Sequence, residues 1–342
     1  MFANLSFKVL APMKSISIPC ILLAALFSVS CTAAPLNQRP EVNAFIDQMV
    51  KKHGFSYADL SALFAEVKIK NRIIQAMKRP AESKPWHAYR KIFITDRHIN
   101  GGVNFWRSNE SILSKLNQQY AVPAEILVAI IGVETRYGTN TGSHRVIDAL
   151  STLAFDYPKR SKFFLSELEQ FLILCREENM DPMTPTGSYA GAMGLPQFMP
   201  SSFRHYATDF DGDGRRDIWR NQADVMASVA NYFVRHGWKQ GGAITFPIRI
   251  GNIRPVKLLT KGLKPDSTVR KMEAQGLSLP KNLSPDTETK LLKLDNEYGP
   301  SYWVTLHNFY VITRYNHSSL YAMAVYQLSQ EILSRRNAGR VF

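Results

Sequence analysis

Nearly every position between Ile126 and Val133 is apolar, and an acidic residue follows this run almost at once. The stretch reads EILVAIIGVET from Glu125, with no charge between Glu125 and Glu134. Pro123 precedes the run, where a helix tolerates a residue without an N–H, and Gly138 follows it as a stop signal. We therefore predict a helix from Pro123 to about Tyr137. Because it is apolar on nearly all sides, it should lie buried at the centre of the fold.

Helical spacing of apolar residues recurs in three later segments, residues 161–178, 222–236 and 319–334. Each places apolar side chains three or four positions apart on one face. Gly237 follows the second of them as a typical C-terminal cap. Residues 183–200 are rich in Gly, Pro and Met, which indicates a loop or a loop that enters a short helix.

The pattern changes between Ala243 and Leu294. Ile244, Phe246, Ile248 and Ile250 alternate with other residues, and a second short apolar stretch, residues 256–258, follows after Gly and Pro. Alternation of this kind is typical of strands. We predict a mainly α fold (α+β), with a helical core over residues 42–242, a small β-containing subdomain over 243–295 and a C-terminal helical segment over 296–342.

The N-terminus has the layout of a secretory signal over residues 1–31. Two lysines precede an apolar stretch from Ile16 to Val29, which is too short and too interrupted by Pro19 for a convincing membrane span. Cys31 follows SVS in a pattern similar to a bacterial lipobox, in which the cysteine is lipidated and would anchor the protein to the outer membrane. Ordinary cleavage after residues 32–34 is the alternative. Residues 32–41 would then form a polar tether.

The composition of the chain excludes several classes of function. The chain has 342 residues, 45% hydrophobic, enough to bury a sizeable core. Its three cysteines leave only Cys175 after the signal, which excludes an internal disulfide framework. The net charge of +14 favours polyanionic partners, but zinc-finger and RNA-binding patterns are missing, so we expect no nucleic-acid partner. We expect the protein to be a monomer. We also expect no catalytic zinc, because no His-Glu-x-x-His spacing occurs.

Glu134 is the first residue with candidate chemistry. It stands near the C-terminal end of the predicted buried helix, where the helix dipole and the apolar surroundings both disfavour a negative charge, so we expect its pKa to be raised. A carboxylic acid that keeps its proton near neutral pH can protonate the leaving oxygen of a glycoside. The alternative is an ion pair with Arg136 or Arg145.

A second segment, SYAGAMGLPQFMPSS from Ser188 to Ser202, is dense in small residues. Small residues let an extended ligand approach the backbone. Tyr189, Gln197 and Phe198 offer ring stacking and amide hydrogen bonds to sugars. Met193 and Phe198 could equally belong to the hydrophobic core.

Taken together, GVET at 132–135 and GAMGLPQFMPSS at 191–202 resemble the two signatures of the membrane-bound lytic murein transglycosylase B family. The resemblance continues at AFDYPKR (154–160), SVANYF (228–233) and TRYNHS (313–318), and it covers about residues 40–335. It implies a lysozyme-like catalytic core over residues 42–242, whose groove the C-terminal segment completes.

By this resemblance, Glu134 is the sole acid/base of a peptidoglycan lytic transglycosylase. It would protonate the oxygen between N-acetylmuramic acid and N-acetylglucosamine, then accept a proton from the muramoyl C6 hydroxyl, which attacks C1 and closes a 1,6-anhydro ring. No cofactor and no second carboxylate are needed. Asp148 and Asp156 are better interpreted as caps or salt-bridge partners. The partners would be peptidoglycan glycan strands, in the periplasm.

Substrate-binding positions also follow from the resemblance. They are Tyr89, Ser188, Gln197, Tyr232, Tyr315, Asn316 and Tyr321, to which we add Tyr189, Met193 and Phe198 from the small-residue segment. For Asn316 the alternative is N-capping of the last helix, and for the tyrosines it is ordinary packing.

Residues 209–220, DFDGDGRRDIWR, match the first half of an EF-hand calcium loop. The expected ligands are Asp209, Asp211, Asp213, the backbone carbonyl of Arg215, and Asp217. Position 12 is Arg220 in place of Glu, so the resemblance implies a later closing acid, for which Asp224 is the nearest candidate. We expect a structural Ca²⁺, and a metal-free turn is the alternative.

Two further functions stay open at this point. One is a hydrolytic muramidase, in which water attacks the sugar in place of the C6 hydroxyl. The other is a non-catalytic scaffold that binds peptidoglycan without cleaving it.

Overall fold

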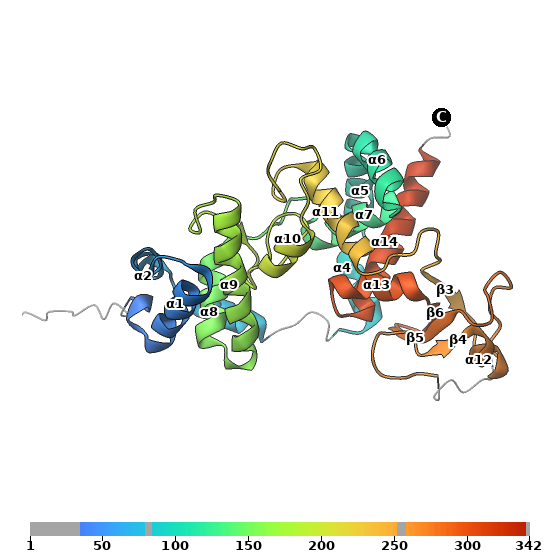
Figure 1. Ribbon diagram of the computed structural model, residues 1–342. Helices are drawn as coiled ribbons and strands as arrows, with labels where there is room; N and C mark the ends of the chain where they lie inside the picture. The colour runs from blue at the N-terminus through green and yellow to red at the C-terminus, as the bar shows by residue number, and fades with distance from the viewer. Residues whose placement is uncertain (1–34, 79–83, 252–257, 340–342) are drawn as a thin grey trace, which may run out of the picture. The chain divides into compact units, whose positions relative to one another are not determined.

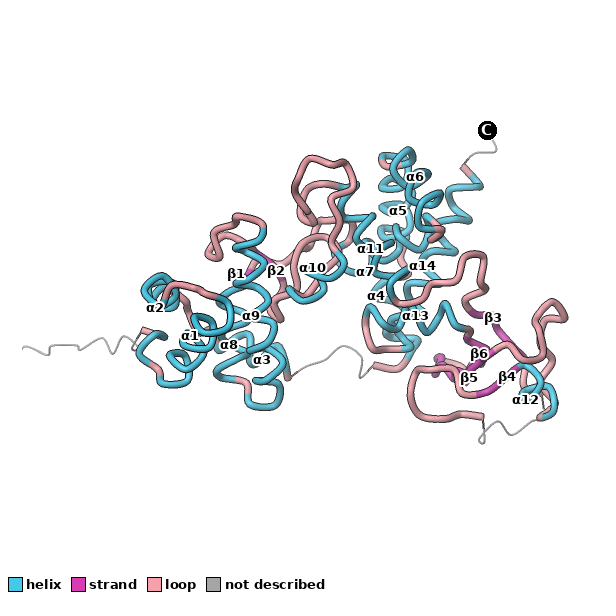
Figure 2. Tube along the Cα trace, in the orientation of Figure 1, coloured by secondary structure: helices cyan, strands magenta, loops and turns pink. Residues whose placement is uncertain are grey.

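The computed structural model describes residues 35–78, 84–251 and 258–339, and most of them are helical (Figure 1). Figure 2 shows that the strands gather in two places. This confirms the mainly α fold with a small sheet. The helices are α1 (Pro40–His53), α2 (Tyr57–Glu66), α3 (Asn71–Met77), α4 (Trp86–Phe93), α5 (Asp96–Ser108), α6 (Glu110–Tyr120), α7 (Ala124–Thr135), α8 (Val146–Asp156), α9 (Ser161–Glu177), α10 (Pro200–Tyr206), α11 (Gln222–Arg235), α12 (Val269–Ala274), α13 (His307–Tyr315) and α14 (Ser319–Ala338), with short 3-10 turns η1 (Leu36–Gln38) and η3 (Pro158–Arg160).

Helices α1, α2, α3, α8 and α9 pack together around aromatic side chains. Phe45 of α1, Phe64 of α2 and Phe155 of α8 meet edge to face, with ring centroids 5.9 to 6.4 Å apart. Such edge-to-face pairs stabilise a core beyond the area that they bury. The rest of the core forms around α7, against which α5, α6, α11 and α14 pack.

The predicted tether over residues 32–41 is wrong for the part that the structure describes. Leu36 is buried, and helix α1 already begins at Pro40. Asn37 donates to the backbone oxygen of Ser61 at 3.0 Å, and Arg39 donates to Asp156 at 2.6 Å. Residues 35–41 are therefore fixed to the helical core. The signal over residues 1–31, with Cys31, lies outside the described residues.

Helix α7 is the buried central helix that the sequence predicts, although it is shorter than expected. It runs from Ala124 to Thr135 instead of Pro123 to Tyr137, and all its residues from Ile126 to Val133 are buried. The helix ends because Arg136, Tyr137 and Gly138 all adopt the left-handed conformation, with φ of 51°, 60° and 88°. Glu134 thus lies in the last turn.

The β subdomain is a four-stranded antiparallel sheet in the order β3–β6–β5–β4, made of β3 (Thr245–Ile248), β4 (Ser267–Thr268), β5 (Glu288–Asn296) and β6 (Gly299–Thr305). In its central pair, Leu291 of β5 lies opposite Val304 of β6, and both are buried against Met272 of α12. The boundary placed at residue 295 falls inside the β5–β6 hairpin, so the sheet continues to Thr305. Residues 252–257, which include most of the apolar stretch at 256–258, lie outside the described residues.

A second, two-stranded sheet joins β1 (His144–Arg145) to β2 (Thr186–Gly187) and was not predicted. It ties the start of α8 to the loop that carries the second signature. Gly142 and Gly187 pack so closely here that a Cβ atom at residue 142 would lie 2.1 Å from the Gly187 oxygen. Only glycine permits this approach.

No single helix in the described ranges is long and apolar enough to cross a membrane. The pair α6 and α7 passes the same test only when taken together, and a bend of 115° separates the two helices.

Candidate active site

Glu134 is held at the end of α7 by a side chain from the C-terminal helix. The hydroxyl of Tyr321 donates to Oε1 of Glu134 at 2.5 Å. Tyr321 lies in the first turn of α14, where Ser318 caps the helix by accepting a hydrogen bond from the Tyr321 backbone N–H. The Glu134 side chain is partly exposed, whereas Thr135 beside it is fully buried. Tyr321 is therefore a defined partner of a carboxyl that remains accessible.

Aromatic side chains surround this carboxyl. The rings of Tyr315 and Tyr321 lie nearly parallel, 8° apart in orientation with centroids 6.4 Å apart. Tyr315 donates its hydroxyl to the backbone oxygen of Pro196 at 2.7 Å. Burial, and then the charge of Glu134, raise the pKa of both tyrosines well above the ordinary value. Both hydroxyls therefore keep their protons across the physiological range and act as donors.

The two signature segments are joined by Thr135. Its hydroxyl donates to the backbone oxygen of Leu195 at 3.1 Å and accepts from the N–H of Gly138 at 3.1 Å. The hydroxyl is buried and has both partners inside the protein, which makes the link costly to break. In this way the turn after α7 and the loop at 188–200 are fixed to each other beside Glu134.

Gln197 lies in this loop with a strained backbone. Its φ of 52° is uncommon for a residue with a side chain. Its amide Nε2 donates to the backbone oxygens of Thr141 at 3.1 Å and Gly194 at 2.8 Å. Backbone strain of this kind persists where the surrounding structure enforces it, often at functional sites.

The other predicted substrate-binding residues of this loop differ in exposure. Tyr189 is 41% exposed. The Ser188 hydroxyl accepts hydrogen bonds from the N–H groups of Ala190 and Ala192, so it shapes the turn and retains its own hydrogen for a ligand. Met193 is fully buried and Phe198 is 2% exposed. These two side chains pack in the core beneath the loop, and direct contact with the substrate stays a prediction for them.

Tyr89, Tyr232 and Asn316 take different positions. Tyr89 is 2% exposed and tilts against Phe93. Tyr232 is 8% exposed and donates to the backbone oxygen of Arg314 at 2.6 Å, so it holds the end of α13. Asn316 follows α13 directly and is partly exposed, and the N-cap of α14 is Ser318.

Arg145, named with Arg136 as a possible ion-pair partner of Glu134, has an acidic partner in the first turn of α8. Arg145 binds Asp148 through two hydrogen bonds of 2.8 and 3.0 Å. Asp156 in turn accepts from Arg39 at 2.6 Å. Both aspartates thus serve as salt-bridge partners, as the sequence predicts.

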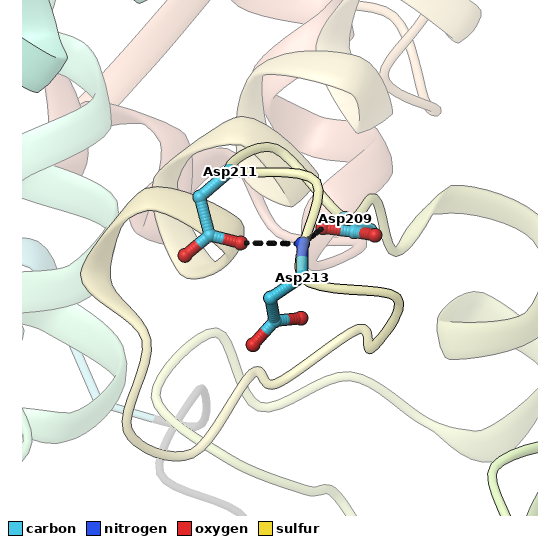
Figure 3. A group of neighbouring side chains, drawn as sticks. All are labelled: Asp209, Asp211 and Asp213. Atoms are coloured by element: carbon cyan, nitrogen blue, oxygen red, sulfur yellow. Dashed lines mark hydrogen bonds between the residues drawn. The ribbon is translucent and has the colours of Figure 1, made fainter.

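Three acids of the EF-hand-like loop gather as expected (Figure 3). Carboxylate oxygens of Asp209, Asp211 and Asp213 lie within 4.8 Å of one another. Asp209 also accepts from the backbone N–H groups of Gly212, Asp213 and Gly214. Three hard oxygen donors at this spacing suit Ca²⁺, so these residues fit the ion.

Asp217, Asp224 and Arg215, the remaining predicted ligands, have other partners. Asp217 accepts from the N–H groups of Trp219 and Arg220. Asp224 is fully buried, and its two oxygens accept from the N–H groups of Phe210 and Asp217. Burial, followed by the nearby charges of Asp211 and Asp209, raises its pKa. The backbone N–H of Arg215 donates to Asp213, and its carbonyl, which is the predicted ligand, stays a prediction. Asp224 thus braces the loop from inside.

Sequence reasoning missed two supporting residues, Thr135 and Tyr137. Tyr137 donates its hydroxyl to the backbone oxygen of His98 at 2.7 Å, and its ring occupies the space in which a Cβ atom at Gly101 or Gly132 would lie. The signal for Thr135 was its place directly after Glu134. Tyr137 could not be identified, because its hydroxyl partner His98 and one of the two glycines at its ring, Gly101, lie on α5, far away in the sequence.

A single carboxyl at the end of a buried helix, held by a tyrosine and flanked by a glycine-rich loop, defines a glycan-cleaving site of the lysozyme-like kind. The chain belongs to the Transglycosylase SLT domain family, whose model matches residues 37–330.

The similar proteins agree with this assignment. Membrane-bound lytic murein transglycosylase B of Escherichia coli (strain K12) is 43% identical over 307 residues, which cover 87% of this chain and 84% of that protein. The catenated lytic transglycosylase SltB1 from Pseudomonas aeruginosa has a TM-score of 0.84 and 48% identity over 88% of this chain and 99% of that chain. The Escherichia coli lytic transglycosylase Slt35 in complex with calcium has a TM-score of 0.80 and 43% identity over 87% of this chain and 94% of that chain.

Proposed function

We propose that this protein is an exported lytic transglycosylase that cleaves the β-1,4 bond between N-acetylmuramic acid and N-acetylglucosamine in peptidoglycan and leaves a 1,6-anhydromuramoyl end. The observation that carries the proposal is the placement of Glu134, an accessible carboxyl in the last turn of a buried helix with Tyr321 as its hydrogen-bond donor. Membership in the transglycosylase family supports it.

In the proposed reaction, protonated Glu134 donates its proton to the bridging oxygen as the bond from C1 to that oxygen breaks. The resulting carboxylate then accepts the proton of the muramoyl C6 hydroxyl while that oxygen bonds to C1. The proton count balances and no water is consumed. Tyr321 holds one oxygen of this carboxyl in place for the proton transfers.

We propose that the C6 hydroxyl attacks C1 instead of water, because the candidate second carboxylates are already engaged. Asp148 and Asp156, the alternative second carboxylates, are both engaged by arginines. A retaining or inverting hydrolase of the usual type would need a second free carboxylate on the far side of the sugar. The arrangement therefore favours the transglycosylase over the hydrolytic muramidase.

The glycan would lie along the loop at 188–200 and the start of α14. Tyr189 is exposed for ring stacking, and Ser188 retains a hydroxyl hydrogen. Gln197 offers its amide oxygen, because its amide nitrogen already donates to Thr141 and Gly194, while Asn316 is partly exposed at the end of α13. Tyr232, Tyr315 and Tyr89 would act mainly by positioning Tyr321 and the loop.

We propose a structural Ca²⁺ at Asp209, Asp211 and Asp213, with no role in the chemical steps. The close approach of their carboxylates and the calcium complex of Slt35 support it. The ion would neutralise the repulsion among these acids and tighten the turn that leads into α11.

We also propose a periplasmic location, with Cys31 as a lipid anchor to the outer membrane. The apolar N-terminus supports export, and the membrane-bound name of the Escherichia coli relative agrees with an anchor. Mass spectrometry of the mature N-terminus would show a diacylated or triacylated Cys31 if this is right.

The function is tested on purified sacculi with the mature protein. Mass spectrometry of the released fragments should find 1,6-anhydromuramoyl ends. Reducing muramoyl ends would identify the muramidase instead, and no release of fragments would indicate a binding scaffold.

A further inference from the structure

A cleft of about 650 Å³ lies between α4, α14 and the hairpin of β5 and β6. From α14 it takes residues that follow Tyr321 by five to ten positions, Gln327 and Gln330 among them. Successive residues of a helix are rotated by about 100°, so Gln330 lies about 180° around α14 from Tyr321. The cleft and the carboxyl of Glu134 therefore use different faces of the same helix.

Two aromatic side chains of the hairpin line the cleft, Tyr298 and Trp303. Tyr298 stands in the two-residue loop between the paired residues Asn296 and Gly299, and it is 97% exposed. A ring so exposed buries almost no surface, so the fold does not need it. Trp303 is partly exposed, and Tyr326 meets its ring edge to face, with centroids 6.3 Å apart. Exposed aromatic rings that gather at a cleft indicate a binding surface.

The rest of the wall is polar and electrically balanced. No Ala, Val, Leu, Ile, Met or Phe is among the described residues that line the cleft. Two basic and two acidic side chains face each other across it, so that with His87 neutral the formal charge is zero: Arg90, Lys91, Glu297 and Glu331. The whole chain, in contrast, carries +14. A wall of this kind suits neither an apolar peptide nor an anion, because it lacks aliphatic contacts and excess positive charge.

Two amide side chains supply polar contacts beside the rings. Gln327 accepts from Nε of Arg90 at 2.8 Å through its oxygen, and Asn296 donates to the hydroxyl of Ser301 at 2.8 Å through its nitrogen. The nitrogen of Gln327 and the oxygen of Asn296 have no partner in the part of the chain that the structure describes. The cleft thus offers one donor and one acceptor in fixed orientations.

We propose that this cleft is a second carbohydrate site, which binds a stretch of uncharged N-acetylated amino sugars and holds it without cleaving it. Sugar rings have flat C–H faces that stack on aromatic rings, while their hydroxyl and acetamido groups need donors and acceptors such as these amides. The class of ligand follows from the side chains. Only the statement that the bound chain is a strand of the polymer that Glu134 cleaves rests on the proposed function. A polymer held at both places would dissociate more slowly than one held at Glu134 alone.

The first experiment follows the indole N–H signals of the five tryptophans by NMR in the mature protein with Glu134→Gln. The probe is a peptide-free tetramer of β-1,4-linked N-acetylglucosamine. We expect the Trp303 signal, assigned with Trp303→Phe, to shift and saturate, while that of Trp106, which does not line the cleft, stays constant. Adding Tyr298→Ala should raise the sugar concentration at half-saturation of the Trp303 shift about fivefold or more, the usual cost of truncating an aromatic anchor. A Trp303 signal that does not move, or that Tyr298→Ala leaves unaltered, would overturn the second site.

The second experiment measures binding to purified sacculi by co-sedimentation, again with Glu134→Gln so that nothing is cleaved. Tyr298→Ala should lower the affinity about fivefold or more. Tyr57→Ala is the matched control, because Tyr57 is an exposed tyrosine on α2 that does not line the cleft, and it should bind like the parent. Equal losses in the two variants, or no loss in either, would contradict the proposal. The proposed function is judged separately, by whether the parent releases 1,6-anhydromuramoyl ends.

Discussion

Tyr321 donates its hydroxyl hydrogen to Oε1 of Glu134 at 2.5 Å, although the two residues are 187 positions apart in the chain. The contact joins the end of the central helix α7 to the beginning of the C-terminal helix α14, which pack against each other. The direction of the carboxyl is therefore set by a segment that is synthesised last.

Replacing Glu134 by Gln should abolish cleavage while glycan binding remains. The amide keeps the shape of the side chain but can neither donate the required proton nor accept one, and general acid/base groups contribute about 100-fold or more to rate. Release of fragments from sacculi measures turnover, and co-sedimentation with sacculi measures binding. Glu125→Gln, at the opposite end of α7, is the control and should keep full activity. A Glu134→Gln variant that clears murein as fast as the parent would end the acid/base assignment.

Tyr321→Phe should lower kcat by about 10- to 100-fold, since one hydrogen bond to a charged group is worth about 1.5–3 kcal/mol. The ring still packs in the core, so the melting temperature should change little. Tyr326→Phe removes a hydroxyl from the same helix α14 away from Glu134 and should behave like the parent. If both variants retain full kcat over the whole pH range, Tyr321 does not position the acid.

Thr135→Val should lower the free energy of unfolding by about 1–3 kcal/mol, because it leaves the Leu195 oxygen and the Gly138 N–H without their partner. Urea denaturation measures this loss. Thr139→Val removes an exposed hydroxyl that water can replace, so its effect should be within about 0.5 kcal/mol. If Thr135→Val and Thr139→Val lower the free energy of unfolding equally, the buried hydrogen bonds of Thr135 add no more stability than an exposed hydroxyl does.

Calcium should raise the melting temperature, and a chelator should lower it by a few degrees without eliminating cleavage. Asp211→Asn removes one of the three clustered carboxylates and should weaken the response to calcium. Asp286→Asn, an exposed acid paired with Arg270 elsewhere, should leave it unchanged. Identical melting of the parent in chelator and in added calcium would refute a bound ion.

The stability of the protein should fall as the pH decreases below about 6.5, in part because of His98. Burial, followed by the charges of Arg136 and Arg97, lowers the pKa of this imidazole in the folded state. The unfolded chain then takes up a proton that the folded chain resists, so acid favours unfolding. Melting curves at pH 5 and 7.5 should show a smaller difference for His98→Gln than for the parent. An NMR titration that finds His98 protonated at pH 7 would contradict this.

Sequence patterns predicted those features of the protein that depend on residues close together in the chain. The apolar run before Glu134 predicted a buried helix because no face of it could tolerate water. Its true end at Thr135 depends on the left-handed conformations of Arg136 and Tyr137, neither of which has the residue type that usually adopts them. The acidic spacing predicted the cluster at Asp209, but the role of Asp224 depends on burial.

Other features depend on contacts that spacing cannot reveal. Leu36 looked like part of a polar tether because its neighbours are polar, yet it packs into the core. Met193 and Phe198 belong to a signature with substrate-binding members, but the fold of the loop turns them inward. The pairing of Thr135 with Leu195 joins residues 60 positions apart. Only the tertiary structure brings such partners together.

The three consecutive left-handed residues after Thr135 fix the position at which α7 ends. Each residue of a helix rotates the next side chain by about 100°, so one inserted residue would swing the carboxyl of Glu134 away from Tyr321 and into packed neighbours. Strained residues cost about 1–3 kcal/mol each and cannot shift along the chain to absorb the change. Insertions and deletions inside α7 should therefore abolish activity even when the helix still forms.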